Sequence, residues 1–120
     1  MKLRTRRNSI RLRLSRRDLA ALLASGAVEE RVDFPHGQAL RFRLERSAAA
    51  VADAAYAGGT LTVRFPAQAI DAWTDPAEVS MTAECTVDGG TLTLLVEKDY
   101  QCLAPREGED DDDLFPNPGA

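Results

Sequence analysis

Short stretches in which hydrophobic residues alternate with polar or charged ones recur along the chain, and such alternation predicts half-buried β-strands. In the first stretch Ile10, Leu12 and Leu14 alternate with Arg11 and Arg13. The pattern occurs at residues 10–14, 28–34, 40–45, 61–65, 79–85 and 92–96. We therefore expect six strands, each of which buries its hydrophobic face and leaves the other face in solvent.

A helix over residues 16–25 is predicted from its two ends. Ser15 is placed to cap its start, Asp18 lies where a capping box needs a carboxylate, and Gly26 ends it. The paired arginines that open it, followed by AALLASGA, also resemble a twin-arginine signal peptide with a cleavage site. We favour the helix because the apolar run is short and because cleavage would remove the first strand and helix.

A second helix is predicted after Pro66, a residue that suits the first turn of a helix. It would turn Ile70 and Trp73 inward and close before Pro76. The alanine-rich residues 47–59 leave two alternatives open. They allow a short helix by propensity, or a bent strand that enters a glycine turn.

The elements follow the same order twice, over residues 10–46 and 61–98. Each copy reads strand, helix, strand, strand. We therefore predict a single α+β domain over residues 1–120, built from two βαββ units related by a pseudo-two-fold axis. The strands would form an antiparallel or mixed sheet, or close into a small barrel, with the tail at 99–120 packed back on the domain.

Composition agrees with an ordinary soluble protein, with 44% hydrophobic and 28% charged residues. No apolar run approaches the roughly 20 residues that span a bilayer, so no membrane association is expected. Cys85, Cys102 and His36 are scattered, which does not match a zinc site. We expect no cofactor, a core position for Cys85, and reduced thiols in a cytoplasmic protein, although a disulfide between the two cysteines stays open.

Charge is distributed unevenly although the net charge is only −4. The first 17 residues carry eight bases and no acid, whereas residues 107–113 carry six acids and no base. The basic start alone would suggest nucleic acid. Because overall acidity repels a phosphate backbone at long range, we expect the two segments to neutralise each other instead.

Two pairs of arginines form the first candidate site. Arg11 and Arg13 share one side of the first strand, and Arg41 and Arg43 share one side of the third. If these strands are neighbours, four guanidinium groups form one surface suited to a phosphate-bearing ligand. The simpler reading, which we favour, is a solvated face whose arginines pair with carboxylates.

The end of the last strand carries the second candidate site, formed by Glu97, Lys98, Asp99 and Cys102. A cysteine near a lysine can act as a nucleophile when its pKa is lowered. Its base would have to be His36 or a carboxylate. The structural alternative pairs Glu97 with Lys98 and uses Cys102 to anchor the tail, so no catalytic role is assigned.

The acidic run is the third candidate, in which Asp110 and Asp112 could hold a hard cation. It lacks the glycine and terminal glutamate of an EF-hand loop, and consecutive aspartates are more often a solvated run. We therefore assign no metal site. The apolar LFPNP segment that follows suits docking into a groove.

Three segments resemble a family of short, uncharacterised bacterial proteins: NSIRLRLS, LTVRFPAQAIDAW, and LVEKDYQCLAPR with an aspartate-rich stretch and FPNP. EKDYQCL followed by DLFPNP is the most specific part. The resemblance covers nearly the whole chain, implies a cytoplasmic protein and carries over no catalytic residues. We expect a non-enzymatic module that binds a partner protein or itself. The alternative is a binder or hydrolase of a phosphate-bearing small molecule.

Overall fold

The computed structural model describes residues 1–100 and 113–116, which form eight strands, two α-helices and one 3-10 turn. In chain order these are β1 (Lys2–Thr5), β2 (Ser9–Leu14), α1 (Arg16–Ser25), β3 (Ala27–Asp33), η1 (Pro35–Gly37), β4 (Ala39–Ser47), β5 (Asp53–Ala57), β6 (Thr60–Pro66), α2 (Ala67–Trp73), β7 (Ser80–Val87) and β8 (Gly90–Lys98). The predicted α+β class and the two short helices are confirmed. Neither of these helices is long and apolar enough to cross a membrane.

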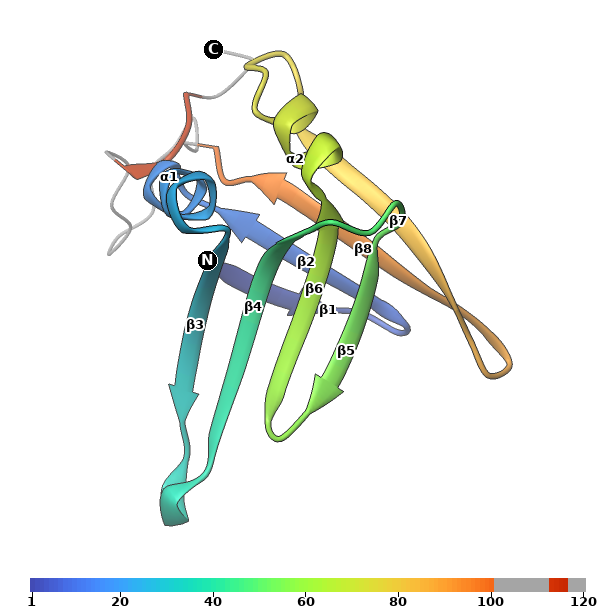
Figure 1. Ribbon diagram of the computed structural model, residues 1–120. Coiled ribbons are helices and arrows are strands. Elements are labelled where there is room, and N and C mark those ends of the chain that lie inside the picture. The colour runs from blue at the N-terminus through green and yellow to red at the C-terminus, as the bar shows by residue number, and fades with distance from the viewer. Residues whose placement is uncertain (101–112, 117–120) are drawn as a thin grey trace.

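The strands form two four-stranded mixed sheets, which we call sheet A (β1-β2-β8-β7) and sheet B (β3-β4-β6-β5). In each sheet the two central strands are parallel and the outer pairs are antiparallel. The sheets face each other with their strands crossing, and both helices lie toward the same end (Figure 1). The predicted barrel is wrong for the described strands, because they belong to two separate sheets rather than one closed one.

Each half of the chain contributes two strands to each sheet. In the first half β1 and β2 enter sheet A, and α1 then carries the chain to the β3–β4 hairpin of sheet B. In the second half β5 and β6 enter sheet B, and α2 carries the chain to the β7–β8 hairpin of sheet A. The second strand of each half therefore lies parallel to the last strand of the other half at the centre of a sheet, β2 beside β8 and β6 beside β4.

The core fills the space between the inner faces of the two sheets and the buried sides of the helices. Alternation along β2, β4, β6 and β8 supplies most of it, as the sequence predicts. The buried hydrophobic residues of this core are Leu12, Leu14, Leu22, Val28, Phe42, Leu44, Val63, Phe65, Ile70, Trp73, Met81, Leu94 and Val96. The outer faces are left to polar and charged residues, so chemistry has to be sought there and at the sheet ends.

The α1 helix has the ends that the sequence predicts. The Ser15 side chain accepts a hydrogen bond from the Asp18 backbone N–H, and Asp18 accepts from the Ser15 backbone in return. Gly26 has φ 84°, a left-handed conformation that glycine adopts without steric cost, and its N–H donates to the Leu22 carbonyl at 2.8 Å. This helix turns Leu22 into the core.

The α2 helix also turns its predicted residues, Ile70 and Trp73, inward. The indole Nε1 of Trp73 donates to the Val79 carbonyl at 3.1 Å and so ties the segment after the helix to its last turn. Val79, expected on the inner face of the next strand, is 43% exposed. That expectation is wrong because β7 begins at Ser80, after the Val79 backbone has already been used as an acceptor.

Two edge strands lie outside the six predicted ones. β1 pairs with β2 and β5 pairs with β6, both antiparallel, at the outer margins of the sheets. The formation of β5 settles the choice left open for residues 47–59 in favour of a strand at 53–57. These two edge strands have only four and five residues and no buried side chain, so their hydrophobic pattern is too weak to predict them.

Candidate functional site

The outer face of sheet A gathers cations from two neighbouring strands and the turn between them, and we call this part of it the basic face. In the β1–β2 register Lys2 lies opposite Arg13 and Arg4 lies opposite Arg11. In the β2–β8 register Arg11 lies beside Leu95 and Arg13 lies beside Glu97. Arg6 follows β1 in the turn. The basic face is thus formed by Lys2, Arg4, Arg6, Arg11 and Arg13, with Thr93, Leu95 and Glu97 of β8.

The carboxylate of Glu97 lies between two of these cations. Its Oε1 accepts from Nε of Arg11 and from Nε of Arg13, both at 2.6 Å. Burial alone would raise the pKa of Glu97, but the two arginines outweigh that effect and hold its pKa below its usual range. A carboxylate that holds its proton so weakly is a poor general base near neutral pH. Glu97 therefore organises the arginines rather than offering itself for proton transfer.

The outer face of sheet B carries the other predicted arginines and has balanced charge. Arg43 lies 3.9 Å from Glu29 and 3.2 Å from Glu45, while Arg64 lies 3.9 Å from Glu45 and 3.7 Å from Asp53. The strand register places four arginines and four carboxylates on this face: Arg31, Arg41, Arg43 and Arg64, with Glu29, Asp33, Glu45 and Asp53. It is the solvated, paired face that the simpler hypothesis describes.

The four predicted arginines therefore do not form one surface. Arg11 and Arg13 lie on β2 in sheet A, whereas Arg41 and Arg43 lie on β4 in sheet B. The condition for a shared surface, that β2 and β4 are neighbours, is not met, because α1 carries the chain from one sheet to the other between them. Sequence order alone gives no sign of that crossing, since both strands show the same alternation.

Sequence reasoning missed Lys2, Arg4 and Arg6 as members of the basic face. Their alternation with Leu3 and Thr5 is the signal that could have placed them on one side of a strand. These basic residues were counted only as part of a charged segment because a four-residue strand with one large hydrophobic residue has little pattern of its own.

The basic face is hollowed in two places. One depression of about 270 Å³ lies beside the β1–β2 turn and is lined by Arg4, Arg6, Ser9, Ile10, Arg11, Thr93 and Leu95. The other, of about 220 Å³, is lined by Lys2, Leu3, Arg4, Arg11 and Arg13. Arginine side chains enclose both, so the face offers charged hollows rather than a flat charged surface.

Lys98 lies on the opposite side of β8 from Glu97, because neighbouring residues of a strand point to opposite faces. Its Nζ donates to the carbonyls of Asp75 at 2.8 Å and Glu78 at 2.6 Å. It also lies 5.8 Å from the centroid of the Trp73 ring. Burial lowers the pKa of the Lys98 ammonium, although the negative charges of Asp75 and Glu78 act to raise it. The predicted Glu97–Lys98 pair is therefore wrong. Lys98 instead holds the segment after α2 against the end of β8.

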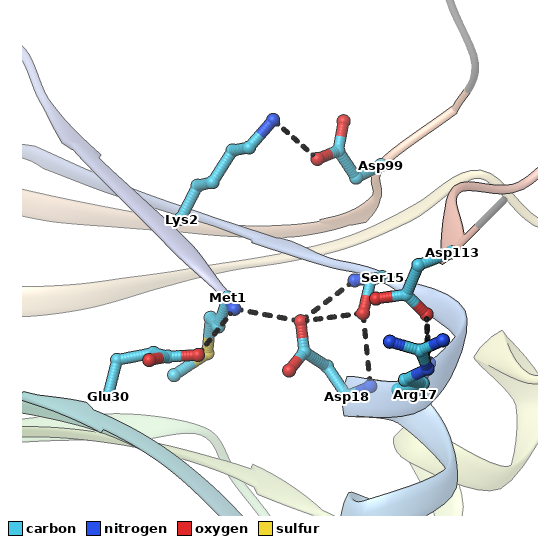
Figure 2. Close-up of polar contacts among 8 residues, drawn as sticks. All are labelled: Met1, Lys2, Ser15, Arg17, Asp18, Glu30, Asp99 and Asp113. Atoms are coloured by element: carbon cyan, nitrogen blue, oxygen red, sulfur yellow. Dashed lines mark hydrogen bonds and ion pairs between the residues drawn. The ribbon is translucent and has the colours of Figure 1, made fainter. Parts of the chain in front are cut away.

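Asp99 lies at the end of β8 and is only 7% exposed. Its carboxylate lies 2.9 Å from Nζ of Lys2 (Figure 2). Its backbone N–H donates to the Leu14 carbonyl at 2.8 Å. The backbone bond extends the β2–β8 pairing by one residue. A small hollow of about 170 Å³ beside it is lined by Arg13, Val79, Glu97, Lys98, Asp99 and Tyr100. Glu97, Lys98 and Asp99 thus line one hollow, but all three already have partners.

The amino group of Met1 is enclosed by two carboxylates. It lies 2.8 Å from Asp18 Oδ2 and 2.9 Å from Glu30 Oε1 (Figure 2). Met1 therefore connects α1 to the inner face of sheet B. Burial alone would lower the pKa of this amine, but the hydrogen bonds and charges of Asp18 and Glu30 outweigh burial and raise it. The contact fixes the start of β1, and with it the cations of the basic face.

We expect the Met1 ammonium to make stability fall at alkaline pH. A raised folded pKa means that the contribution is complete below the unfolded pKa of about 8 and is lost as pH rises through the folded value. Glu30→Gln should lower the free energy of unfolding at pH 7 and flatten its fall toward pH 10, measured by urea unfolding. Glu29→Gln, next in sequence but on the outer face, is the matched control. Equal pH dependence in both variants would contradict the assignment.

The described part of the tail returns to the same end of the molecule. Asp113 accepts from the Arg17 backbone N–H at 3.0 Å, Leu114 is buried, and the Tyr100 and Phe115 rings lie 5.8 Å apart. Burial alone would raise the pKa of Asp113, but Ser15 and Arg17 outweigh it and lower the pKa. Residues 113–116 therefore lie against α1 and the end of β8.

The remaining candidates lie elsewhere. Cys102, Asp110 and Asp112 fall outside the described residues. Cys85 is a free, half-buried thiol 3.8 Å from the Ala52 carbonyl oxygen. Within residues 1–100 and 113–116, no three histidine, cysteine, aspartate or glutamate side chains gather as metal ligands.

A family model described as "Family of unknown function (DUF7009)" matches residues 1–119 of the chain. No curated protein and no solved structure matches it. The family match groups the chain without assigning an activity, so the function has to be argued from the residues.

Proposed function

The chain belongs to this family of unknown function, and we propose that it is a non-enzymatic binding module whose basic face holds an anionic partner. The observation that carries the proposal is the difference between the two outer faces. The outer face of sheet B carries four arginines and four carboxylates. Among the described residues of the outer face of sheet A, the five cations of the basic face are accompanied by Glu97, by Glu84 on β7 and, at the margin, by Asp99. Like charges on one face repel each other and lower the stability of the fold. A face with excess positive charge is therefore better explained by binding an anion than by a structural role.

Binding is favoured over hydrolysis because the carboxylate among the arginines is already committed. Glu97 accepts from both Arg11 and Arg13, and its pKa is lowered. A hydrolase would need a group near the ligand that accepts a proton at neutral pH. Arginines without such a base are suited to hold an anion in place.

We also propose that the two halves of the chain derive from a duplication. The order hairpin, helix, hairpin occurs in each half, and each half crosses between sheets in the opposite sense. From the resemblance of the EKDYQCL and DLFPNP segments we further expect a bacterial, cytoplasmic protein.

The test compares two arginines that face outward from different sheets. Among the described residues, no carboxylate lies within ion-pair distance of Arg4 on the basic face or of Arg41 on sheet B. Tripolyphosphate should raise the melting temperature of the unaltered protein, since a ligand that binds the folded state stabilises it. Arg4→Glu should weaken binding by about tenfold or more, and Arg41→Glu, with the same change in net charge, should leave it nearly unchanged.

A panel of anionic ligands should be tested, with nucleotides and an acidic peptide beside tripolyphosphate. All are measured at one ionic strength, because salt screens attraction between surface charges. If no anion raises the melting temperature, the proposed function is wrong. If Arg4→Glu and Arg41→Glu weaken binding equally, attraction depends on net charge alone and the basic face is not the binding surface.

A further inference from the structure

We infer that the depression beside the β1–β2 turn is a subsite for the phosphoryl group of a small molecule. This inference rests on the proposed function and makes it more specific. The depression has a volume of about 270 Å³, and its walls come from β1, β2, β8 and the turn. Sites for drug-sized ligands usually measure about 300–1,000 Å³. The space therefore suits a phosphoryl or diphosphoryl group with a small organic part.

Among the described residues, Arg4 and Arg6 of this depression are the least compensated cations on the basic face. Arg4 and Arg11 lie directly opposite each other in the antiparallel pair, an arrangement in which like charges repel. Arg11 shares the single Oε1 of Glu97 with Arg13. In the described part of the chain no carboxylate lies within ion-pair distance of Arg4 or Arg6. A bound anion would relieve this repulsion at the end of the face that Glu97 does not reach.

The arginines can still donate to a ligand. The contact of Arg11 with Glu97 uses Nε, so the terminal amino groups of the guanidinium can bind a second anion. Thr93 adds a hydroxyl to the lining from the adjacent strand. The three guanidinium groups and the hydroxyl together have more hydrogen-bond donors than the two oxygens of one carboxylate can accept. They match a phosphoryl group, which has three oxygens and up to two charges.

The turn that carries these arginines is held in place by β8. The Asn8 side chain donates to the Thr91 carbonyl at 2.8 Å, and the Thr93 N–H donates to the Asn8 carbonyl at 3.0 Å. Within the turn, Ser9 Oγ donates to the Arg6 carbonyl at 2.6 Å. Arg7 adopts φ 52°, a left-handed conformation that is uncommon for arginine. These contacts fix the depression before any ligand arrives, which reduces the entropy lost on binding.

A polymeric ligand fits this depression less well than a small one. The chain has a net charge of −4, which repels a long polyanion, whereas a single phosphoryl group mainly senses the local cations. Ile10 and Leu95 add apolar surface to the lining. They give the carbon skeleton of a small phosphate ester a surface to pack against.

The test uses pyrophosphate as the probe and two variants that differ by one position in the turn. Arg6 lines the depression, and Arg7 beside it does not. Arg6→Gln should weaken pyrophosphate binding in calorimetry by about tenfold, and Arg7→Gln by less than about threefold, although both remove one charge. Citrate, a tricarboxylate of comparable charge near neutral pH, should bind more weakly than pyrophosphate. Equal losses in the two variants, or equal binding of citrate, would overturn the phosphoryl subsite.

A second pair of variants keeps the test independent of net charge. Thr93→Val removes the hydroxyl that lines the depression, and Thr82→Val removes one from the same face of sheet A but outside it. We expect the first to weaken binding several-fold and the second to have no effect, with both variants folded by circular dichroism. Amide shifts on pyrophosphate addition should centre on residues 6–9 and Thr93.

The outcome separates this inference from the proposed function. Shifts centred instead on Lys2, Arg13 and Glu97 would overturn the turn subsite and leave the basic face as the binding surface. If neither pyrophosphate nor any other anion of the panel binds, both are wrong.

Discussion

Replacing Trp73 by alanine is expected to lower the free energy of unfolding by about 3–5 kcal/mol, the range for large buried aromatic residues. Trp73 is only 2% exposed and belongs to the core between the sheets. Its Nε1 donates to the Val79 carbonyl, and the Lys98 ammonium lies over its ring. The substitution would leave a cavity, remove one of two donors to the Val79 carbonyl and remove one of two rings near the Lys98 ammonium. Urea unfolding followed by far-ultraviolet circular dichroism would measure the loss.

Trp73→Phe is the matched control for this prediction. It keeps an aromatic ring near Lys98 but removes the donor to Val79 and part of the volume, so we expect a loss of about 1–2 kcal/mol. Since small domains are stable by only about 5–15 kcal/mol, the alanine variant should be close to unfolding at ordinary temperature. An alanine variant that loses less than about 1 kcal/mol would show that α2 contributes little to the core.

Glu97→Gln is expected to change stability and anion binding in opposite directions. The substitution leaves Arg11 and Arg13 without their shared carboxylate, which should cost about 1–3 kcal/mol of stability. It also removes the negative charge from the centre of the basic face. Tripolyphosphate should then bind more tightly, by about threefold at low salt. Urea unfolding and calorimetry on the same preparation would measure both effects.

The pH dependence of stability gives Glu97 an independent test. A folded pKa below the unfolded value of about 4.3 means that the contribution is present above that pH and is lost as pH falls through the folded pKa. Glu97→Gln should therefore lose less stability on acidification than the unaltered protein. Glu84→Gln, on the same sheet face and exposed, is the control and should keep the original acid dependence. Tighter anion binding in both variants would show that net charge, and not the position of Glu97, sets affinity.

Sequence reasoning located the central strands and both helices because each has a strong local cause. The strands that form the centres of the sheets alternate over several residues, and α1 carries its own caps at Ser15 and Gly26. The edge strands β1 and β5 were missed because their neighbours, rather than their own side chains, make them strands. The same reason explains why Arg4 and Arg6 were not assigned to a face.

The sequence by itself determined which face of each central strand is buried, where α1 begins and ends, and that Arg11 and Arg13 share one side of a strand. These properties follow from a two-residue or helical period and from side chains that bond to their own backbone. Only the tertiary structure decided that β2 pairs with β8 and β4 with β6, since parallel partners far apart in sequence leave no local signature. That pairing places Glu97 between Arg11 and Arg13, separates them from Arg41 and Arg43, and gives the outer face of sheet A more cations than carboxylates among the described residues.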